Sequence, residues 1–219
     1  MAHAVIFDMD GVIVDSERYW KRAVADILDE AGVGDDVDPE DVLGANVYDQ
    51  YDWLADHYDP EISADEYFAL FDERAATIYT DRADLLDGFH DLLDGLDERG
   101  VPVAVCTSSF PHWVEMAFDA HGLHGRFDEV VNAAEMDVPG KPEPDLYEAA
   151  ADELGVPIED CVVVEDSGHG VESAARAGAH VVALETTVNE NMDISMADER
   201  ASDAAGLRER VLAAVDDDP

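Results

Sequence analysis

The sequence predicts an α/β protein with a doubly wound parallel sheet, interrupted once by an inserted α-helical cap domain. Short runs rich in Val, Ile and Ala recur along the 219 residues, and helical stretches lie between most of them. The runs are continuous rather than alternating, which is typical of strands covered by helices on both faces of a parallel sheet. Only residues 16–82, after the first run, break this rhythm with helical patterns and no strand pattern.

The expected strands come in order as His3–Phe7, Val101–Cys106, Glu129–Val131, Cys161–Val164 and His180–Leu184. The helices expected between the later strands each stop at a glycine, a residue that commonly ends helices. These helices cover Gly88–Arg99, Trp113–Ala120, Pro144–Leu154 and Val171–Ala177. Alternating strands and helices of this kind favour parallel pairing through helical crossovers.

The insertion is expected to form an α-helical cap domain of residues 16–82, leaving residues 1–15 and 83–219 as the α/β core domain. In its first helical pattern, the apolar side chains fall on one face, as in a helix packed against neighbours. The helical patterns of the insertion cover Glu17–Ala31, Tyr48–His57 and Ala64–Tyr79.

Acidic residues dominate the composition: 54 Asp and Glu stand against 12 Lys and Arg, which leaves a formal net charge of −42. This charge argues against nucleic acid and anionic membranes as partners. The acids are spread along the chain, as on a solvated surface. Because such a charge repels itself unless salt screens it, the composition indicates a salt-rich cytoplasm, as in a halophile such as a halophilic archaeon.

Dialysis into low salt is therefore expected to unfold the protein. The Debye length is about 3 Å at 1 M salt and about 30 Å at 0.01 M, so dilution exposes each carboxylate to many others. Circular dichroism during dialysis would follow the loss of helix. An unchanged spectrum in dilute buffer would refute the inference.

The sequence also predicts a cytoplasmic location. No segment approaches the roughly 20 apolar residues that span a bilayer, and the N-terminus lacks the basic stretch and apolar core of a signal peptide. Cys106 and Cys161 lie at the end and the start of apolar runs. They are expected to be small buried hydrophobes rather than a disulfide or a metal-binding pair.

Polar side chains follow four of the expected strands. In strand order they are Asp8 and Asp10, then Thr107, Ser108 and Ser109, then Lys141 in the following loop, and finally Glu165 and Asp166. Ligands of open parallel sheets bind beyond the carboxyl ends of the strands. We therefore expect these side chains to surround one site.

This set of side chains suits a magnesium-bound phosphate. Crowded carboxylates raise each other's pKa unless a cation joins them, and Mg²⁺ takes oxygen ligands while keeping waters for the substrate. Lys141 and the Thr107 hydroxyl could bind the anionic oxygens that the metal leaves. The chain has only two lysines, Lys21 and Lys141. In a chain so poor in lysine, the one in the GKPEP stretch is expected to have a functional role.

The same residues resemble the motifs of the haloacid dehalogenase superfamily. In order, the matching stretches are DMDGVIVDSE at 8–17, Thr107 in VCTSS, Lys141 in GKPEP, and Glu165 with Asp166 in VVVEDSGHG. The resemblance covers nearly the whole chain. An insertion after the first motif is similar to members with a helical cap, the subfamily of β-phosphoglucomutase and phosphoglycolate phosphatase. The implied core is Rossmann-like.

The resemblance implies a phosphatase that hydrolyses a small phosphorylated metabolite, such as a sugar phosphate or a phosphoglycolate-like compound. Asp8 would be the nucleophile that forms an aspartyl-phosphate. Asp10 would be the general acid and base. Thr107 and Lys141, with main-chain N–H groups near Ser108, would hold the phosphoryl oxygens.

The resemblance also implies a Mg²⁺ cofactor, bound by the Asp8 carboxylate, the Asp10 carbonyl and Asp166, with Glu165 helping directly or through water. The cap would close over the core, and Trp20, Asn46 and Tyr48 are the expected substrate contacts there. Members with this cap are often monomers, and a monomer is expected.

A phosphomutase of the β-phosphoglucomutase type is the main alternative. Those enzymes usually carry a histidine shortly after the first motif, where this chain reads Arg18-Tyr19-Trp20-Lys21. They also carry a cap arginine that grips a distal phosphate, and the corresponding turn, residues 43–47, has none. The sequence therefore favours a phosphatase. A dehalogenase is disfavoured because that branch lacks the second aspartate, present here as Asp10.

A non-catalytic, acidic cation-binding or regulatory protein that keeps the fold is the alternative from another class. Such a protein would need neither Asp10 nor Lys141. Their presence beside Asp8, Thr107 and Asp166 speaks for an enzyme.

Overall fold

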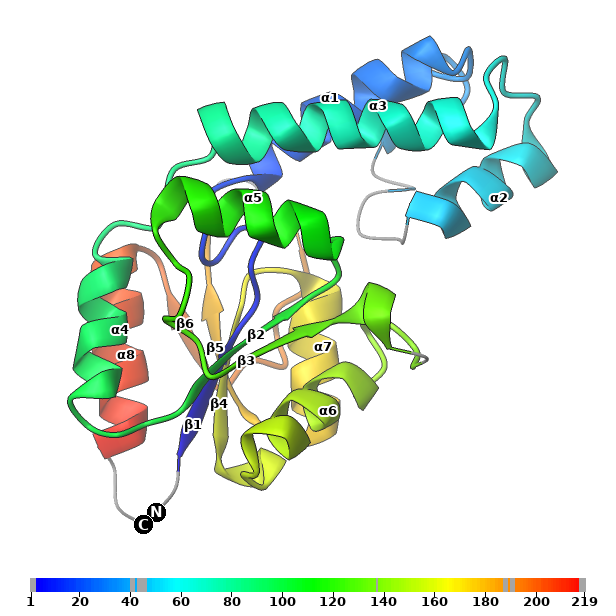
Figure 1. Cartoon of the computed structure of the whole chain (residues 1–219). Coiled ribbons are helices and arrows are strands. Elements are labelled where there is room, and N and C mark those ends of the chain that lie inside the picture. Colours follow the sequence, from blue (N-terminus) through cyan, green and yellow to red (C-terminus); the bar gives the residue numbers. More distant parts are fainter. Residues whose placement is uncertain are drawn as a thin grey trace. The chain divides into compact units, whose positions relative to one another are not determined.

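Figure 1 shows the computed structural model of the chain, which describes residues 3–39, 42, 47–136, 138–186, 189 and 192–216. The chain divides into two compact units. One comprises Met1–Asp15 with Asp84–Pro219, and the other comprises Ser16–Ala83. We call them the α/β unit and the helical unit, and each is described by itself.

The α/β unit is built on a six-stranded sheet with the order β3-β2-β1-β4-β5-β6. All five pairings between neighbouring strands are parallel, which confirms the predicted doubly wound, Rossmann-like fold class. The strands are β1 (Ala4–Phe7), β2 (Val103–Thr107), β3 (Glu129–Asn132), β4 (Cys161–Glu165), β5 (His180–Leu184) and β6 (Glu199–Ala201).

Strand β1 lies inside the sheet, between β2 and β4. Its Val5 is in register with Val103 of β2 and with Val162 of β4. Every residue of β1, β2 and β4 is buried. Burial on both faces explains the continuous apolar runs of the sequence. The register also aligns the carboxyl ends of these strands, where the polar residues begin.

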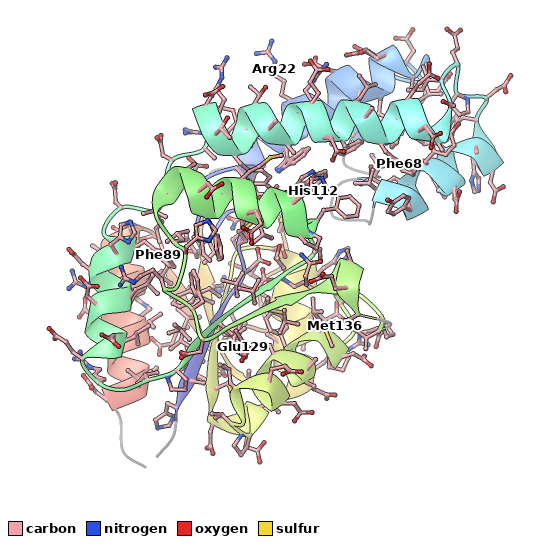
Figure 2. The ribbon with its side chains drawn as sticks, viewed as in Figure 1. Arg22, Phe68, Phe89, His112, Glu129 and Met136 are labelled. Carbon is pink, nitrogen blue, oxygen red and sulfur yellow. The ribbon has the colours of Figure 1, made fainter. Side chains whose placement is uncertain are left out.

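Helices cover both faces of the sheet, as Figure 1 shows for α6 and α7 on one side and α4 and α8 on the other. The helices of this unit are α4 (Phe89–Asp97), α5 (Pro111–His121), α6 (Asp145–Leu154), α7 (Gly168–Ala177) and α8 (Ala204–Asp216), with short helical turns at Ala133–Glu135 and Ile158–Asp160. Phe89 of α4, labelled in Figure 2, packs edge-on against Phe7 of β1 with 5.3 Å between ring centroids.

The sequence patterns missed two elements at one side of this unit, β6 and α8. Strand β6 has three residues, of which Glu199 and Arg200 are charged, so no apolar run marks it. It is an edge strand, and such strands are often short and charged. Helix α8 buries only Leu207 and Val211 among its described residues, which gives a weak apolar stripe.

The helical unit contains α1 (Glu17–Glu30), α2 (Val47–His57), α3 (Ala64–Thr77) and a π-helical turn at Ile78–Arg82. Its core combines aliphatic side chains, such as Ile27, Leu28 and Leu54, with aromatic ones. Trp20 stacks on Phe71 at 5.9 Å between ring centroids, and its indole N–H donates to the Tyr79 hydroxyl at 3.2 Å. Arg22 is exposed and points away from α1 in Figure 2. A capping box at Ser63 and Glu66 begins α3.

Both cysteines of the chain lie in strands of the sheet. Cys106 and Cys161 are both buried and free, as predicted. In the described part of the chain, no helix combines the length and the apolar character needed to traverse a bilayer.

Candidate active site

The turn after β1 places the first two candidate carboxylates. The Asp8 N–H still donates to the Val164 carbonyl of β4 at 3.0 Å, so Asp8 continues the strand. The chain then turns back, because the Met9 carbonyl accepts the N–H groups of Ile13 and Val14. Gly11 lies in this turn with φ +83°, a conformation that favours glycine. Asp8 and Asp10 therefore leave the strand end from a tight, hydrogen-bonded turn.

Lys141 joins this strand end from the loop before α6. Its Nζ donates to Asp8 Oδ1 at 2.5 Å and to Glu165 Oε1 at 2.7 Å, and reaches the Cys106 carbonyl of β2 at 3.3 Å. The Lys141 side chain is 8% exposed and that of Glu165 is fully buried. One ammonium group thus bridges carboxylates that follow β1 and end β4.

Glu165 accepts hydrogen bonds on both oxygens. Besides Lys141, Oε1 accepts the Tyr147 hydroxyl at 2.7 Å, and Oε2 accepts the backbone N–H groups of Asp166 and Ser167 and the Ser167 hydroxyl, each at 3.0 Å. A Cβ at Gly170 would lie 1.7 Å from Oε1, so the glycine leaves the space that this carboxylate fills. The Glu165 carboxylate is therefore held rigidly.

Burial and charge shift the pKa values of this group in different directions. Burial raises the pKa of Asp8 to about 7; Lys141 opposes this shift and Glu165 adds to it. Burial alone would lower the pKa of Lys141, but Asp8 and Glu165 hold it well above its usual range. For Glu165, Lys141 and the hydrogen-bond donors outweigh burial and lower the pKa. Lys141 contacts both carboxylates, but the surroundings favour the ionised form of Glu165 and disfavour that of Asp8.

Three buried carboxylates, those of Asp8, Glu165 and Asp166, could hold a metal ion. Each offers an oxygen, and these oxygens all lie within 4.8 Å of one another. Lys141 is the cation that pairs with Asp8 and Glu165, so three acids exceed the positive charge of one lysine. An all-oxygen set with excess negative charge fits Mg²⁺.

Gly11 sets the position of one of these carboxylates. A Cβ at Gly11 would lie 2.1 Å from Asp166 Oδ2, so glycine lets Asp166 approach the turn after β1. Gly11→Ala is expected to turn the Asp166 carboxylate away and to weaken Mg²⁺ binding about 10–100-fold, as displaced supports of metal ligands do. Isothermal titration with Mg²⁺ in molar KCl would measure this.

Gly100→Ala is the matched control, because Gly100 also has a positive φ (+67°) but a Cβ there would meet nothing within 4 Å. Both variants should lose about 1–2 kcal/mol of unfolding free energy in urea from the left-handed backbone. Only Gly11→Ala should lose Mg²⁺ affinity. Equal Mg²⁺ affinity in the two variants would show that Gly11 does not position Asp166.

A second group of contacts surrounds Asp10. Its Oδ2 accepts the Ser109 hydroxyl at 2.6 Å, and the Ser109 N–H donates to Thr107 Oγ1 at 3.0 Å. Asn132, at the end of β3, donates from Nδ2 to the Ser109 carbonyl and accepts the Ala134 N–H at 2.8 Å. The ends of β2 and β3 and the turn after β1 are thereby linked.

The fourth strand end is held by a residue far along the chain. The amide of Asn189 donates to the carbonyls of Asp166 at 2.6 Å and Leu184 at 2.8 Å, which ties the end of β4 to the end of β5. Ser167 caps α7, since its hydroxyl accepts the Gly170 N–H at 3.0 Å. Asp166 therefore sits between a strand end and a helix N-terminus, both of them fixed.

The structure thus brings most of the sequence-predicted site residues to one edge of the sheet. One group consists of Lys141 and the carboxylates of Asp8, Glu165 and Asp166. In a second group, Ser109 hydrogen-bonds to both Asp10 and Thr107. Ser108, which lies between Thr107 and Ser109 in the chain, is exposed. The sequence patterns did not single out Tyr147, Asn132 or Asn189. A buried tyrosine or asparagine needs hydrogen-bond partners, but the sequence does not show which partners these are, so it offered no signal that places them at this site.

The predicted substrate contacts of the helical unit are Trp20, Asn46 and Tyr48, and the two that the structure describes differ in exposure. Trp20 is 7% exposed and packs in the core of that unit, so its placement does not favour substrate contact. Asn46 lies outside the described residues. Tyr48 is 52% exposed and packs edge-on against Phe68. These contacts remain predictions.

A doubly wound sheet with carboxylates, a lysine and a hydroxyl at its strand ends defines an α/β enzyme whose site lies where that class binds its ligands. A sequence model of the haloacid dehalogenase-like hydrolases matches residues 2–178. The chain belongs to that family.

Curated relatives support the assignment. The chain is 35% identical to the probable pseudouridine-5'-phosphatase of Drosophila melanogaster over 81% of this chain and 79% of that protein. It is 32% identical to hexitol phosphatase B of Escherichia coli K12, over 82% of each. It is 32% identical to the chloroplastic protein SUPPRESSOR OF QUENCHING 1 of Arabidopsis thaliana over 85% of this chain, but spans only 18% of that protein's length. The phosphatase relatives indicate a phosphoric monoester hydrolase.

Solved structures share the fold. CbbY from Rhodobacter sphaeroides, crystallised in complex with phosphate, is 25% identical and superposes with a TM-score of 0.79 over 94% of this chain and 99% of its own. β-Phosphoglucomutase from Clostridium difficile superposes with a TM-score of 0.78 at 21% identity, over 99% of this chain and 98% of its own, which shows the fold alone.

Proposed function

We propose that the protein is a Mg²⁺-dependent phosphatase that hydrolyses a small phosphorylated metabolite through an aspartyl-phosphate. The observation that carries the proposal is the bridge from Lys141 to Asp8 and Glu165 at the strand ends, with the Asp166 carboxylate beside it. The names of the relatives, hexitol phosphatase and pseudouridine-5'-phosphatase, support a phosphorylated sugar-like substrate.

Asp8 acts as the nucleophile in the first step. A carboxylate oxygen attacks phosphorus, the bond from phosphorus to the ester oxygen breaks, and Asp10 gives its proton to the departing alkoxide. In the second step water attacks the phosphorus of the aspartyl-phosphate and gives a proton to Asp10. The Asp8 carboxylate leaves, phosphate is released, and both aspartates return to their starting states.

Lys141 and Thr107 position the phosphoryl group. The ammonium already contacts Asp8, so it lies where it can offset negative charge on the phosphoryl oxygens. The Thr107 hydroxyl accepts the Ser109 N–H and keeps its own hydrogen to donate. Main-chain N–H groups near Ser108 add further donors at the end of β2.

Mg²⁺ would be held by the Asp8 carboxylate, the Asp10 carbonyl and Asp166. Both Glu165 oxygens already accept hydrogen bonds, which favours a contribution from Glu165 through water. When bound, the ion would neutralise charge on the transferring phosphoryl group and align that group with the nucleophile.

The helical unit, Ser16–Ala83, is proposed to be the cap that sets specificity and excludes water, with Asn46 as a substrate contact. The net charge of −42 supports a salt-rich cytoplasm as the working environment. A monomer is proposed, in line with other capped members.

Release of phosphate from 4-nitrophenyl phosphate with Mg²⁺ in molar KCl tests the proposal. We expect turnover that EDTA abolishes and that added Mg²⁺ restores, because Mg²⁺ offsets the excess of buried carboxylates. A screen of phosphorylated metabolites in high salt would then identify the substrate. Absence of turnover in folded protein would favour a non-catalytic cation-binding protein.

A phosphomutase would be recognised by its product. β-Glucose 1-phosphate with a trace of the bisphosphate should give free phosphate rather than glucose 6-phosphate. Formation of glucose 6-phosphate would replace the phosphatase proposal with a phosphomutase.

A further inference from the structure

We propose that Ser109 is a positioning residue, which orients the Asp10 carboxyl group for proton transfer to the leaving oxygen. The inference rests on the proposed function, in which Asp10 is the general acid. It deepens that function by assigning a role to a side chain that contacts Asp10 from another strand end.

The contact itself is short and joins distant segments. Ser109 Oγ donates to Asp10 Oδ2 at 2.6 Å, although the two residues are 99 positions apart. The Asp10 carboxylate is not among the three that gather as a metal-binding group, so its orientation depends on other partners. A hydrogen bond to a carboxylate from a hydroxyl is among the stronger ones and fixes the plane of the acid.

Ser109 can orient another group only if it is itself fixed, and its main chain is anchored on both sides. Its N–H donates to Thr107 Oγ1 at 3.0 Å, and Thr107 is the last residue of β2. Its carbonyl accepts the side-chain amide of Asn132 at the end of β3. Asn132 is 3% exposed and accepts the Ala134 N–H at 2.8 Å, so it too is held.

This arrangement has a chemical consequence for Asp10. Since Oδ2 accepts the Ser109 hydrogen, the proton of the neutral acid resides on Oδ1, the oxygen from which it passes to the leaving group. Supporting hydrogen bonds of this kind hold a reacting group near its productive geometry. Loss of the Ser109 hydroxyl should leave Asp10 in place but remove one contact that holds its carboxyl group in this orientation.

The test compares 4-nitrophenyl, phenyl and benzyl phosphates, which have similar ring sizes but increasingly basic leaving oxygens. The parameter kcat/KM reports the steps up to release of the alcohol, the step in which Asp10 acts as an acid. Ser109→Ala should lower kcat/KM by about 10–100-fold for benzyl phosphate but by no more than about 3-fold for 4-nitrophenyl phosphate, since positioned acids contribute about 10²–10⁴-fold.

Two further variants complete the comparison. Asp10→Asn should show the same dependence on the leaving group with larger losses, and Ser109→Thr, which keeps a hydroxyl, should restore much of the benzyl phosphate activity. Ser202→Ala, at an exposed serine ahead of α8, should match the wild type on all three esters. Circular dichroism in molar KCl would confirm that each variant is folded.

A uniform loss across the three esters in Ser109→Ala, or no loss on any of them, would overturn the positioning role while leaving the phosphatase proposal intact. If Ser109→Ala does not fold, Ser109→Thr becomes the test. A folded Ser109→Thr that loses benzyl phosphate activity and 4-nitrophenyl phosphate activity equally would overturn the role. Absence of turnover in the wild type would overturn both proposals.

Discussion

Asp8→Asn is expected to abolish phosphate release while leaving the protein folded. An amide cannot attack phosphorus, and loss of a nucleophile costs on the order of 10³–10⁶ in kcat. Asparagine has nearly the same shape, and its carbonyl oxygen can still accept the Lys141 hydrogen bond that Asp8 Oδ1 accepts at 2.5 Å. Phosphate release from 4-nitrophenyl phosphate in molar KCl would measure the loss.

Asp152→Asn is the matched control for Asp8→Asn, because Asp152 is exposed on α6. It should retain wild-type kinetics. Turnover by Asp8→Asn at more than a small fraction of the wild-type rate would show that Asp8 is not the nucleophile.

The same substitution should change how stability depends on pH in the metal-free protein. Burial raises the pKa of Asp8 from 3.8 to about 7, so the folded state binds a proton that the unfolded state has lost. Between pH 3.8 and about pH 7, Asp8 makes the wild type lose stability as pH rises, because the folded state must ionise a buried acid. Asp8→Asn removes this loss.

Urea unfolding in EDTA and molar KCl would test the sign. The stability of Asp8→Asn relative to the wild type should rise between pH 4 and pH 7 and level off above. A relative stability independent of pH, or one that falls, would mean that Asp8 is ionised without cost in the folded protein.

Lys141→Met is expected to cost both stability and activity. Lys141 contacts Asp8 at 2.5 Å and Glu165 at 2.7 Å, and removal of one partner from a buried ion pair typically costs about 3–5 kcal/mol. Loss of a preorganised charge at the phosphoryl oxygens should lower kcat on the order of 10²–10³-fold. Because a cation can offset the negative charge that Lys141 no longer balances, Mg²⁺ should restore part of the stability but not the rate.

Lys21→Met provides the control, since Lys21 is the only other lysine of the chain and lies exposed on α1. Urea unfolding with and without Mg²⁺, together with steady-state kinetics, would compare the two variants. If Lys141→Met were as stable and as active as Lys21→Met, the ion-pair bridge would not organise the site.

Much of the fold was predictable because burial on both faces leaves a clear trace in composition. Strands β1, β2 and β4 are fully buried, so each is a continuous apolar run. The missed strand, β6, pairs along one edge only and contains two charged residues. A three-residue edge strand depends on its neighbour β5 rather than on its own residues, and no local pattern could reveal it.

The candidate site, like the fold, was predictable in part. The acids, the hydroxyl and the lysine could be placed together from the sequence, because strand ends of a parallel sheet share one edge. Glu165 was predicted as a metal ligand, direct or through water; the structure surrounds both its oxygens with donors. Tyr147 could not be assigned to this site beforehand, because a helix periodicity shows that it is buried but not which side chain its hydroxyl meets.

Runs of consecutive residues were enough to predict β1 to β5, the helices between them and the residue types at the strand ends, since local burial and short motifs are properties of neighbouring residues. The contacts of Lys141 with Asp8 and Glu165, and the hydrogen bond from Ser109 to Asp10, became visible in the folded chain alone. These contacts join residues from separate strand ends and loops. Their partners follow from strand register and side-chain packing, which no stretch of consecutive residues encodes.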